Sequence, residues 1–374
     1  MGPGTRIGVL GGGQLGRMLA EAGRPLGFTF RFWDPGSAEA IQGFGDHLRA
    51  AWDDDDAFER FVEGVEVVTL EFENVPVELV RRIAARVPVR PGAAALEVAQ
   101  DRLNEKRRFT ELGIRTNAFR SVDSESGLGA ALDEIGMPAV LKTRRLGYDG
   151  KGQRVLRDAA DVEGAFDALG GVPCILEAFV PFDREVSLVA VRTLEGELHP
   201  WPLVENRHHE GILVRTDAPA DGVSESVRRQ AEEGVRALAD SLDYVGTLAV
   251  EFFQTGDVLL ANEMAPRVHN SGHWTQDGAT TSQFENHLRA ITALPLGPAS
   301  LARPTVMLNL IGERGDPATL LEYEGSRLHD YGKSPRPGRK VGHVNLVGST
   351  ATQARQRAEA LLGHLGGGEP IVCT

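Results

Sequence analysis

The sequence predicts an α/β and α+β protein of two or three domains that begins with a Rossmann-like unit. A short apolar strand at 7–10 leads through the glycine-rich stretch 11–16 into a helical run that ends near Gly23, which is the order of a βαβ unit. Two strand-like runs around a Gly-Asp turn predict a β-hairpin at 249–265. The length of 374 residues is also too great for one ordinary core.

Composition excludes several classes of protein. The fractions of 41% hydrophobic and 25% charged residues are typical of a soluble globular chain, and no apolar run is long enough to span a bilayer. Only Cys174 and Cys373 are present, so we expect no disulfide framework and a reducing, cytoplasmic compartment. A net charge of −13 argues against nucleic acid as a partner.

The first unit contains a motif with two interpretations. A second strand is expected at Thr29–Trp33, and it ends at Asp34, near the position of the ribose-binding acid in dinucleotide-binding domains. A nicotinamide-dependent oxidoreductase is therefore one alternative, although the glycines at 11–16 also serve a tight turn. The acidic run Trp52–Asp56 is expected to cap a helix.

Polar residues follow the next expected strand of this unit. The strand Val65–Phe72 leads directly into Glu73 and Asn74. Ligands of open α/β sheets bind at the carboxyl ends of the strands, so both residues are site candidates. The segment Pro88–Gly92 is interpreted as the exit from the first domain.

Lysine is scarce in this chain. Of 40 basic residues only five are lysines, and a compact ammonium group on a flexible stem is a common phosphate ligand. We therefore expect the five lysines to converge on phosphates, with retention by chance as the alternative. They are Lys106, Lys142, Lys151, Lys333 and Lys340.

The middle of the chain predicts a glycine-rich hairpin. A strand at Met137–Lys142 is followed by the loop 143–153 and a strand at Arg154–Leu156. Such a loop can place backbone N–H groups against phosphates, but it is no Walker A loop because the Gly-Lys-Ser/Thr ending is missing. It either folds over phosphates or is a plain flexible hairpin. Upstream, Arg102 and Lys106 lie four apart on a predicted helix, which ordinarily indicates surface charge.

A further strand, Cys174–Val180, ends at Pro181. Its Glu177-x-x-Val180 segment is suited to presenting backbone groups to an adenine ring. The pair His208 and His209 follows in the next expected sheet. Isolated histidines are more often structural than catalytic, so a structural role is the ordinary interpretation of this pair. An amphipathic helix is expected at Glu225–Leu242.

Two carboxylates of the 249–265 hairpin predict a metal site. Glu251 and Glu263 each lie where the pattern predicts burial, and antiparallel neighbours on one face lie about 5 Å apart. Two unpaired carboxylates at that distance repel, and Mg²⁺ removes the conflict by taking both together with phosphate oxygens. Two surface-pointing glutamates are the alternative. The polar loop Arg267–His273 follows, and a helix at Ser282–Ile291 is expected behind the hairpin.

The C-terminal loop at 331–343 holds four cations among prolines and glycines. In an acidic protein this local reversal of charge indicates an anion site, with a solvated basic loop as the alternative.

Taken together, these motifs resemble the ATP-grasp superfamily and, within it, the 5-(carboxyamino)imidazole ribonucleotide synthases of purine biosynthesis. The resemblance extends from 11–18 to 336–343 and includes 147–153, 262–275 and 282–285. It implies a Rossmann-like domain at 1–98 that binds no dinucleotide, a small lid at 99–182 and a C-terminal α+β domain at 183–374. This last domain would include a small terminal unit from about 303, and ATP would lie between the lid and the C-terminal domain.

The resemblance also implies site residues. Arg102 and Lys142 would contact the ATP phosphates, Glu185 the ribose, and His208 a further part of the nucleotide. Glu251 and Glu263 would hold Mg²⁺ (or Mn²⁺), with Asn262 alongside. The loop over the phosphates would consist of Gly147, Tyr148, Asp149, Gly150, Lys151, Gly152 and Gln153, and the adenine hinge of Glu177, Ala178, Phe179 and Val180. The ribonucleotide and bicarbonate side would be lined by Glu73, Tyr148, Asp149, Lys151, Arg267, His269, Asn270, Ser271, Lys333, Arg339 and Lys340.

The reaction implied is an ATP- and bicarbonate-dependent carboxylation of 5-aminoimidazole ribonucleotide through carboxyphosphate, catalysed by a homodimer. Arg267, His269 and Lys340 are the expected catalytic residues. One departure from the family pattern is Leu146, where many relatives have a glycine. The alternatives are another ATP-grasp ligase acting on glycinamide ribonucleotide or biotin, the dinucleotide-dependent oxidoreductase, and a non-catalytic ATP-binding module.

Overall fold

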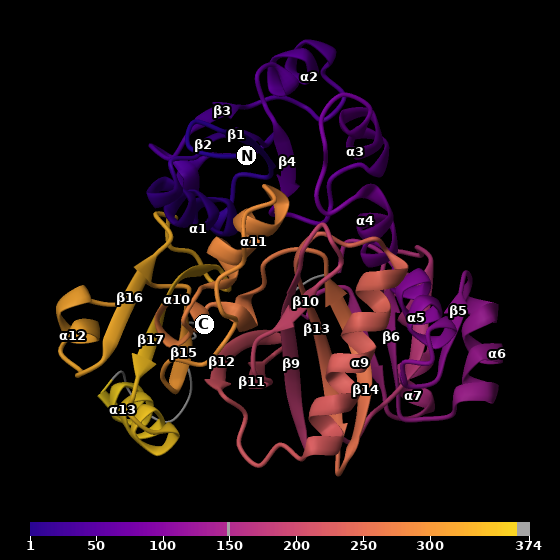
Figure 1. Ribbon diagram of the computed structural model, residues 1–374. Coiled ribbons are helices and arrows are strands. Elements are labelled where there is room, and N and C mark those ends of the chain that lie inside the picture. The colour runs from indigo at the N-terminus through magenta and orange to yellow at the C-terminus, as the bar shows by residue number, and fades with distance from the viewer. Residues whose placement is uncertain (148–149, 365–374) are drawn as a thin grey trace.

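The computed structural model describes residues 1–147 and 150–364, which fold around three β-sheets (Figure 1). The first sheet has strand order β3-β2-β1-β4, and all its strands are parallel. Its strands are β1 (Arg6–Leu10), β2 (Thr29–Trp33), β3 (Asp46–Leu48) and β4 (Val67–Leu70). Its helices are α1 (Gln14–Gly23), α2 (Asp55–Val62), α3 (Val77–Ala84) and α4 (Ala93–Ala99), with short 3₁₀ turns at Arg24–Leu26 and Glu39–Ile41.

The predictions for this sheet are largely confirmed. The strands at 7–10 and 29–33 and the helix to Gly23 are present. Asp54 caps α2 by accepting a hydrogen bond of 2.8 Å from the backbone N–H of Ala57. The strand predicted at 65–72 is shorter, because β4 stops at Leu70 before the polar segment begins.

The second sheet is antiparallel, with strand order β5-β8-β6-β7. The predicted glycine-rich hairpin is its β6–β7 pair, and the strand predicted to reach Val180 is β8, which ends at Ala178. Its strands are β5 (Phe119–Val122), β6 (Ala139–Thr143), β7 (Gln153–Leu156) and β8 (Cys174–Ala178). The helices of this part are α5 (Arg102–Glu111), α6 (Glu125–Ile135), α7 (Ala159–Val162) and α8 (Ala165–Ala168).

The third sheet has nine strands, in the order β14-β13-β9-β11-β12-β15-β17-β16, with β10 on β9. The strands of the C-terminal segment, β15 to β17, therefore continue the sheet that begins with the β13–β14 hairpin. The strands are β9 (Arg184–Arg192), β10 (Leu198–Pro200), β11 (Val204–His209), β12 (Ile212–Ala218), β13 (Gly246–Thr255), β14 (Val258–Ala265), β15 (Thr305–Ile311), β16 (Ser326–Asp330) and β17 (Lys340–Val347).

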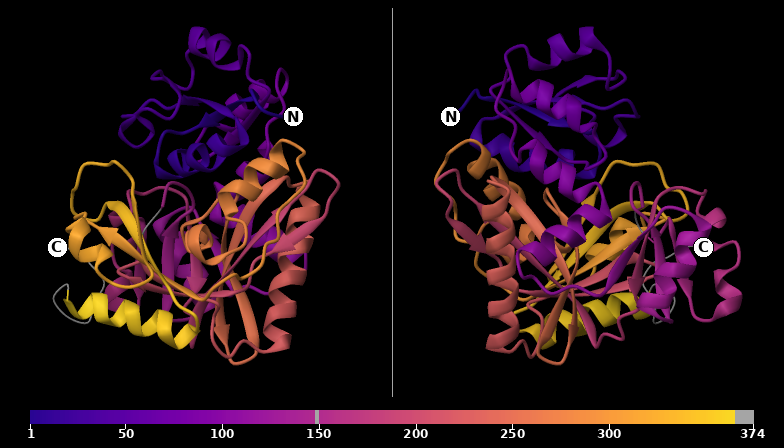
Figure 2. Two further views of the ribbon diagram at one scale, coloured as in Figure 1. Left: turned by 60° about the vertical axis from the view of Figure 1, so that its left-hand side comes forward. Right: turned by 90° about the vertical axis from the view of Figure 1, so that its right-hand side faces the viewer.

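Helices cover both faces of this large sheet. The predicted amphipathic helix is α9 (Glu225–Ser241), whose apolar side packs into the core against β9, β13 and β14. Helix α11 (Gln283–Ile291) lies between the sheet and the first domain, as all views show (Figures 1 and 2). The remaining helices are α10 (Thr275–Gly278), α12 (Pro317–Leu321) and α13 (Ala351–His364), with a 3₁₀ turn at Asn270–Gly272. Among the described residues, no helix is long and apolar enough to cross a membrane.

Helix α11 joins the first domain to the large sheet. Leu288 and Ile291 pack in one apolar cluster with Ile7 and Leu19. The fully buried His287 connects the two sheets directly: its Nε2 lies 2.7 Å from Thr69 Oγ1 on β4, and its Nδ1 accepts a hydrogen bond of 3.0 Å from Thr247 N on β13. Because Nδ1 accepts, Nε2 carries the proton, and the imidazole is neutral.

The buried His287 predicts an acid-dependent loss of stability. Burial lowers its pKa to about 3, whereas the unfolded chain protonates the same ring near pH 6.5. The unfolded state therefore binds more protons below that pH, and stability falls as the pH falls. In His287→Gln this contribution is absent. Lowering the pH from 7.5 to 5 is therefore expected to reduce the Tm of the wild-type protein more than that of His287→Gln, so that the difference between the two Tm values narrows. Parallel Tm curves over that range would contradict the assignment.

Candidate active site

The paired carboxylates lie on the β13–β14 hairpin, as predicted. Glu251 is the direct cross-strand neighbour of Glu263, with a bulge immediately after Glu251. Their side chains are 13% and 39% exposed, so Glu251 is largely buried, whereas Glu263 is partly open to the cleft that it lines. The hairpin turn is at Gly256, whose φ of +55° is readily adopted by glycine.

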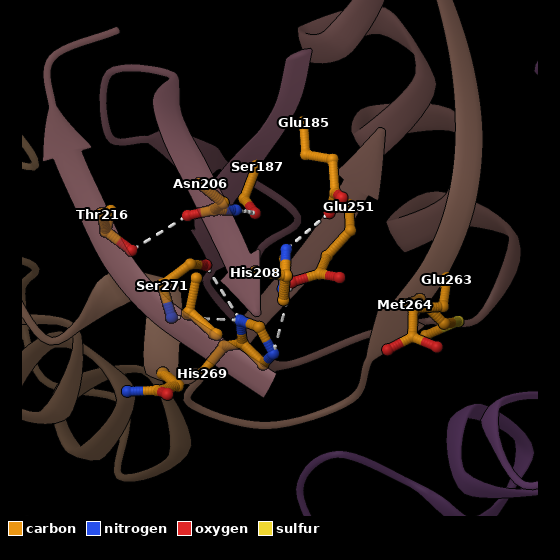
Figure 3. A network of polar contacts seen from close by, with 12 residues as sticks. Glu185, Ser187, Asn206, His208, Thr216, Glu251, Glu263, Met264, His269 and Ser271 are labelled. Atoms are coloured by element: carbon orange, nitrogen blue, oxygen red, sulfur yellow. Dashed lines mark hydrogen bonds and ion pairs between the residues drawn. The ribbon is translucent and has the colours of Figure 1, made fainter. Parts of the chain in front are cut away.

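The two carboxylates have different surroundings. Arg102 Nη1 donates a hydrogen bond of 2.7 Å to Glu263 Oε2. Although burial opposes it, this guanidinium keeps the pKa of Glu263 below its ordinary value. Glu251 lies 3.8 Å from His269 Nε2 (Figure 3), and burial raises its pKa to about 7.

The donor set of the hairpin fits a hard divalent cation. Two carboxylates face each other, and Asn262 Oδ1 is buried without a hydrogen-bond partner among the described residues. Oxygen ligands are those that Mg²⁺ prefers. The described part of the chain has no group of three or more His, Cys, Asp or Glu side chains able to hold a metal, so an ion held here would take its remaining oxygen ligands from water or phosphate.

Strands β9 and β11 bring Glu185 and His208 next to this hairpin. His208 Nδ1 lies 2.6 Å from Glu185 Oε2, although the hydrogen is not aligned for a regular hydrogen bond. Figure 3 shows His208 beside Glu251, with Ser187, Asn206 and Thr216 forming a polar row behind it. The contact with Glu185 raises the pKa of His208, although burial alone would lower it.

The predicted hinge residues lie at the end of β8. The Glu177 side chain is fully buried, and Lys142 Nζ lies 3.2 Å from its Oε2. Ala178 already uses both backbone groups, because its N–H donates to Ala118 O and its carbonyl accepts from Asn117 Nδ2. Phe179 and Val180 follow the strand, and Phe179 is 45% exposed.

A cleft of about 960 Å³ opens between the three sheets. Its wall includes many of the predicted residues, contributed by the first domain, the lid, the hairpin and the C-terminal loop. These are Glu73, Arg102, Gly147, Lys151, Glu263, Arg267, His269, Asn270, Lys333, Arg339 and Lys340. The predicted residues Tyr148 and Asp149 lie outside the described part of the chain.

Arg267 and His269 both lie in the cleft wall. Arg267 Nε forms an ion pair with Glu73 Oε2. Burial and the Arg267 cation lower the pKa of His269 to about 3, so its imidazole is neutral. Its Nδ1 lies 2.8 Å from Ser271 Oγ, and because Ser271 is fully buried it orients His269 instead of facing the cleft. Asn270 pairs with Asn309 through amide hydrogen bonds of 2.7 and 3.1 Å.

Gln283, at the start of α11, positions His269 but was not predicted as a site residue. Its Oε1 accepts a hydrogen bond of 2.9 Å from His269 N, and its Nε2 donates one of 2.7 Å to His269 O. The motif containing Gln283 was recognised in the sequence. Its inward orientation depends on the placement of the helix behind the loop.

The C-terminal loop is attached to the first domain. Lys333 Nζ donates a hydrogen bond of 2.9 Å to Gln14 Oε1. Arg339 Nη1 lies 3.3 Å from Glu39 Oε2, which also accepts from Ser334 N. Burial and the nearby Arg339 lower the pKa of Lys333 to about 8. Neither Gln14 nor Glu39 was a predicted site residue, since each contacts the loop from about 300 positions away.

The glycine-rich loop of the first domain is occupied by the chain's own carboxylates. Glu71 accepts hydrogen bonds from Gly13 N at 2.8 Å and Gly16 N at 3.3 Å, and Asp34 accepts from Gly12 N at 2.8 Å. A Cβ at Gly11 would lie only 2.5 Å from Glu71 Oε1. The donors that hold a pyrophosphate in dinucleotide-binding domains are therefore already satisfied, which argues against the oxidoreductase interpretation and against Asp34 as a ribose ligand.

The lid loop approaches the turn between β11 and β12. Gly150 has φ +75°, and a Cβ there would lie 2.5 Å from Glu210 O, so glycine is required for this close approach. Leu146 adopts φ +62° and is 72% exposed at the edge of the cleft.

The surface interpretation of Arg102 and Lys106 is wrong. Arg102 bonds Glu263, and Lys106 is 1% exposed inside the lid, where it contacts Asn117 and Glu177. The cause is that β14, far away in the sequence, covers this face of α5. Glu105 on the same face is also buried, and its Oε1 accepts a hydrogen bond of 2.5 Å from Met264 N.

Three family models match the chain in order. They are a ribonucleotide synthetase preATP-grasp domain at residues 4–100, an ATP-grasp domain at 107–284 and a phosphoribosylaminoimidazole carboxylase C-terminal domain at 305–357. Together they extend over the three sheets described above.

The chain is also similar to named relatives along nearly its whole length. It is 52% identical over 341 residues to N5-carboxyaminoimidazole ribonucleotide synthase of Pseudomonas aeruginosa, covering 91% of this chain and 94% of that protein. Among solved structures, N5-carboxyaminoimidazole ribonucleotide synthetase from Thermus thermophilus has a TM-score of 0.92 at 52% identity, covering 97% of this chain and 99% of that one. The enzyme of Aspergillus clavatus in complex with ADP and 5-aminoimidazole ribonucleotide has a TM-score of 0.88 at 30% identity, covering 96% and 98%.

Proposed function

The chain belongs to the N5-carboxyaminoimidazole ribonucleotide synthases, ligases of the ATP-grasp fold, and on this premise we propose how its own residues carry the reaction. ATP and bicarbonate are consumed, and the exocyclic amine of 5-aminoimidazole ribonucleotide is carboxylated. The observation that carries this proposal is the Glu251–Glu263 cross-strand pair, whose Glu263 lines a cleft with walls rich in cations.

The nucleotide is proposed to lie between the lid and the hairpin. Lys142 and Arg102 contact its phosphates, the backbone after Glu177 contacts adenine, and Glu185 with His208 contacts the ribose. Glu251, Glu263 and Asn262 would hold Mg²⁺, or Mn²⁺ in its place, and the ion would neutralise charge on the transferring phosphoryl group. The lid loop from Gly147 to Gln153, with Gly150, Lys151 and Gly152, is proposed to cover the phosphates.

Bicarbonate is a poor electrophile, so its oxygen first attacks the terminal phosphorus of ATP, giving ADP and carboxyphosphate. Carboxyphosphate then releases phosphate and CO₂. The amine attacks CO₂ and loses a proton, which yields the N-carboxylate. Since carboxyphosphate hydrolyses readily, exclusion of water by the lid is part of the mechanism.

Arg267 and the neutral His269 are proposed to hold bicarbonate and guide this transfer. Both lie in the cleft wall, and the neutral ring of His269 offers a hydrogen bond without adding charge. Lys340 is the third proposed catalytic residue and lies at the start of β17 in the same wall. The ribonucleotide side is proposed to include Glu73, Tyr148, Asp149, Lys151, Asn270, Ser271, Lys333 and Arg339, with Ser271 acting through His269. We further propose a cytoplasmic homodimer.

One assay tests the function as a whole. ADP release from ATP and Mg²⁺ is expected only when bicarbonate and 5-aminoimidazole ribonucleotide are both present. Omitting each co-substrate in turn is the control. Release of ADP at the same rate with glycinamide ribonucleotide replacing the imidazole would instead support another ligase of the same fold.

A further inference from the structure

Lys106 is a buried ammonium group that none of the proposed site functions uses. Its side chain is 1% exposed. Its Nζ donates hydrogen bonds of 2.9 Å to Asn117 Oδ1 and 3.0 Å to Ala261 O, and lies 3.4 Å from Glu177 Oε2. Three acceptors match the three donors of a protonated lysine, so the geometry holds a positive charge in the interior, although burial lowers the pKa of Lys106.

The same carboxylate of Glu177 serves a second lysine. Its Oε2 lies 3.2 Å from Lys142 Nζ and accepts a hydrogen bond of 3.0 Å from Asn117 Nδ2. Lys106, Glu177 and Lys142 therefore form a row in which one negative charge is shared by two positive ones. The row has a net charge of +1, and its more exposed end is Lys142, at 11% against 1% for Lys106.

Removing the ammonium of Lys106 changes this balance. Glu177 then keeps Lys142 as its one lysine neighbour, and these two charges cancel, with Arg102 acting on the carboxylate from the cleft wall. The Lys142 ammonium is drawn toward the carboxylate by an attraction that it no longer shares with Lys106. An anion entering the site from the cleft would meet one positive charge fewer.

Lys106 also reaches the strand that carries the metal-site residues. Ala261 O, which it binds, lies two positions before Glu263 on β14, the edge strand of the large sheet. The same carbonyl accepts from Thr116 Oγ1 at 3.0 Å, and Ala261 N donates to Arg115 O at 2.8 Å. The outer edge of β14 is thus held by the α5–β5 connection, and Lys106 joins this edge to the lid strand β8 through Glu177.

We propose that Lys106 is a positioning residue for nucleotide binding, whose charge offsets that of Glu177 and so keeps the Lys142 ammonium available to the nucleotide phosphates. The inference rests on the proposed ATP site and adds to it a residue that does not touch the nucleotide. It predicts an effect confined to the phosphate end of the ligand, because Ala178 keeps its backbone bonds to Ala118 and Asn117, and Glu185 keeps its contact with His208.

The test compares ADP with adenosine, by calorimetric titration of the whole protein in the presence of Mg²⁺. In Lys106→Met the affinity for ADP is expected to fall about tenfold, whereas the affinity for adenosine stays within twofold of the wild-type value. Arg107→Met is the matched control, since it removes the neighbouring cation on the same helix, which is exposed. It is expected to leave both affinities unchanged.

A merely structural role gives a different result. If ADP and adenosine lose affinity equally in Lys106→Met, or if neither does, the proposal is overturned. Should that variant not fold, Lys106→Gln provides the same comparison, because it keeps a polar group next to Asn117 and removes only the charge. If the wild-type protein itself binds ADP no better than adenosine, the proposed ATP site has failed, and that outcome is distinguishable from failure of the Lys106 inference alone.

Discussion

Arg267→Met is expected to reduce carboxylation of 5-aminoimidazole ribonucleotide at least about 100-fold, while the affinity for ADP stays within twofold. Arg267 lies in the cleft wall with its guanidinium paired to Glu73, and it is proposed to hold an anionic reactant. Loss of one charged donor to developing negative charge in a site closed to water typically costs a factor of about 10²–10³ in kcat. The nucleotide is proposed to contact Lys142 and Arg102 on other elements, so its binding is expected to be spared.

Two further variants distinguish the loss of this role of Arg267 from a loss of folding. Arg267→Lys keeps the charge but loses the planar two-donor geometry, so its activity is expected to lie between that of wild type and Arg267→Met. Arg229→Met removes an exposed arginine of α9 and serves as the control. Undiminished turnover of Arg267→Met, measured as product formation and not as ADP release alone, would refute the assignment.

The hairpin shows how much of a site local sequence can specify. Its turn at Gly256-Asp257 fixes the pairing from Thr255–Val258 to Phe252–Ala261, but it is the β-bulge after Glu251 that shifts the register by one residue and places Glu251 opposite Glu263. The caps are wholly local, since Asp54 and Ser282 each bond a backbone N–H three residues ahead. Such features depend on neighbours within a few positions and are therefore readable from the chain.

The features that were missed depend on contacts across the fold. The helical pattern of α5 shows that Arg102 and Lys106 share a face, but not that β14, more than 150 positions later, covers it. The glycine-rich loop at 11–16 is compatible either with a bound pyrophosphate or with a partner from the chain itself. The structure shows the second, because Glu71, some 58 positions away, accepts a hydrogen bond from this loop. Gln14 and Glu39 join the site only because the C-terminal loop returns to the first domain.

Glu263→Gln and Glu251→Gln are each expected to lower ATP turnover by about 10³ at saturating bicarbonate and ribonucleotide, and to raise the Mg²⁺ concentration needed for half-maximal rate. The reason is that a neutral amide supplies an oxygen ligand but no charge, and Mg²⁺ binds through one or two carboxylates together with phosphate oxygens. The two variants differ in one respect: Glu263→Gln also frees Arg102 from its 2.7 Å partner.

Because of this difference, the two variants are expected to differ in their affinity for Mg²⁺-free ADP. Because Arg102 is then available to phosphates alone, Glu263→Gln is expected to bind Mg²⁺-free ADP more tightly than wild type, whereas Glu251→Gln lacks an arginine partner to release. Glu225→Gln, an exposed carboxylate at the start of α9, controls for loss of charge in general. If either hairpin variant turned over ATP with an unchanged Mg²⁺ requirement, the ion would have to be held elsewhere. Arg102 alone would then have to offset the repulsion between the two neighbouring carboxylates.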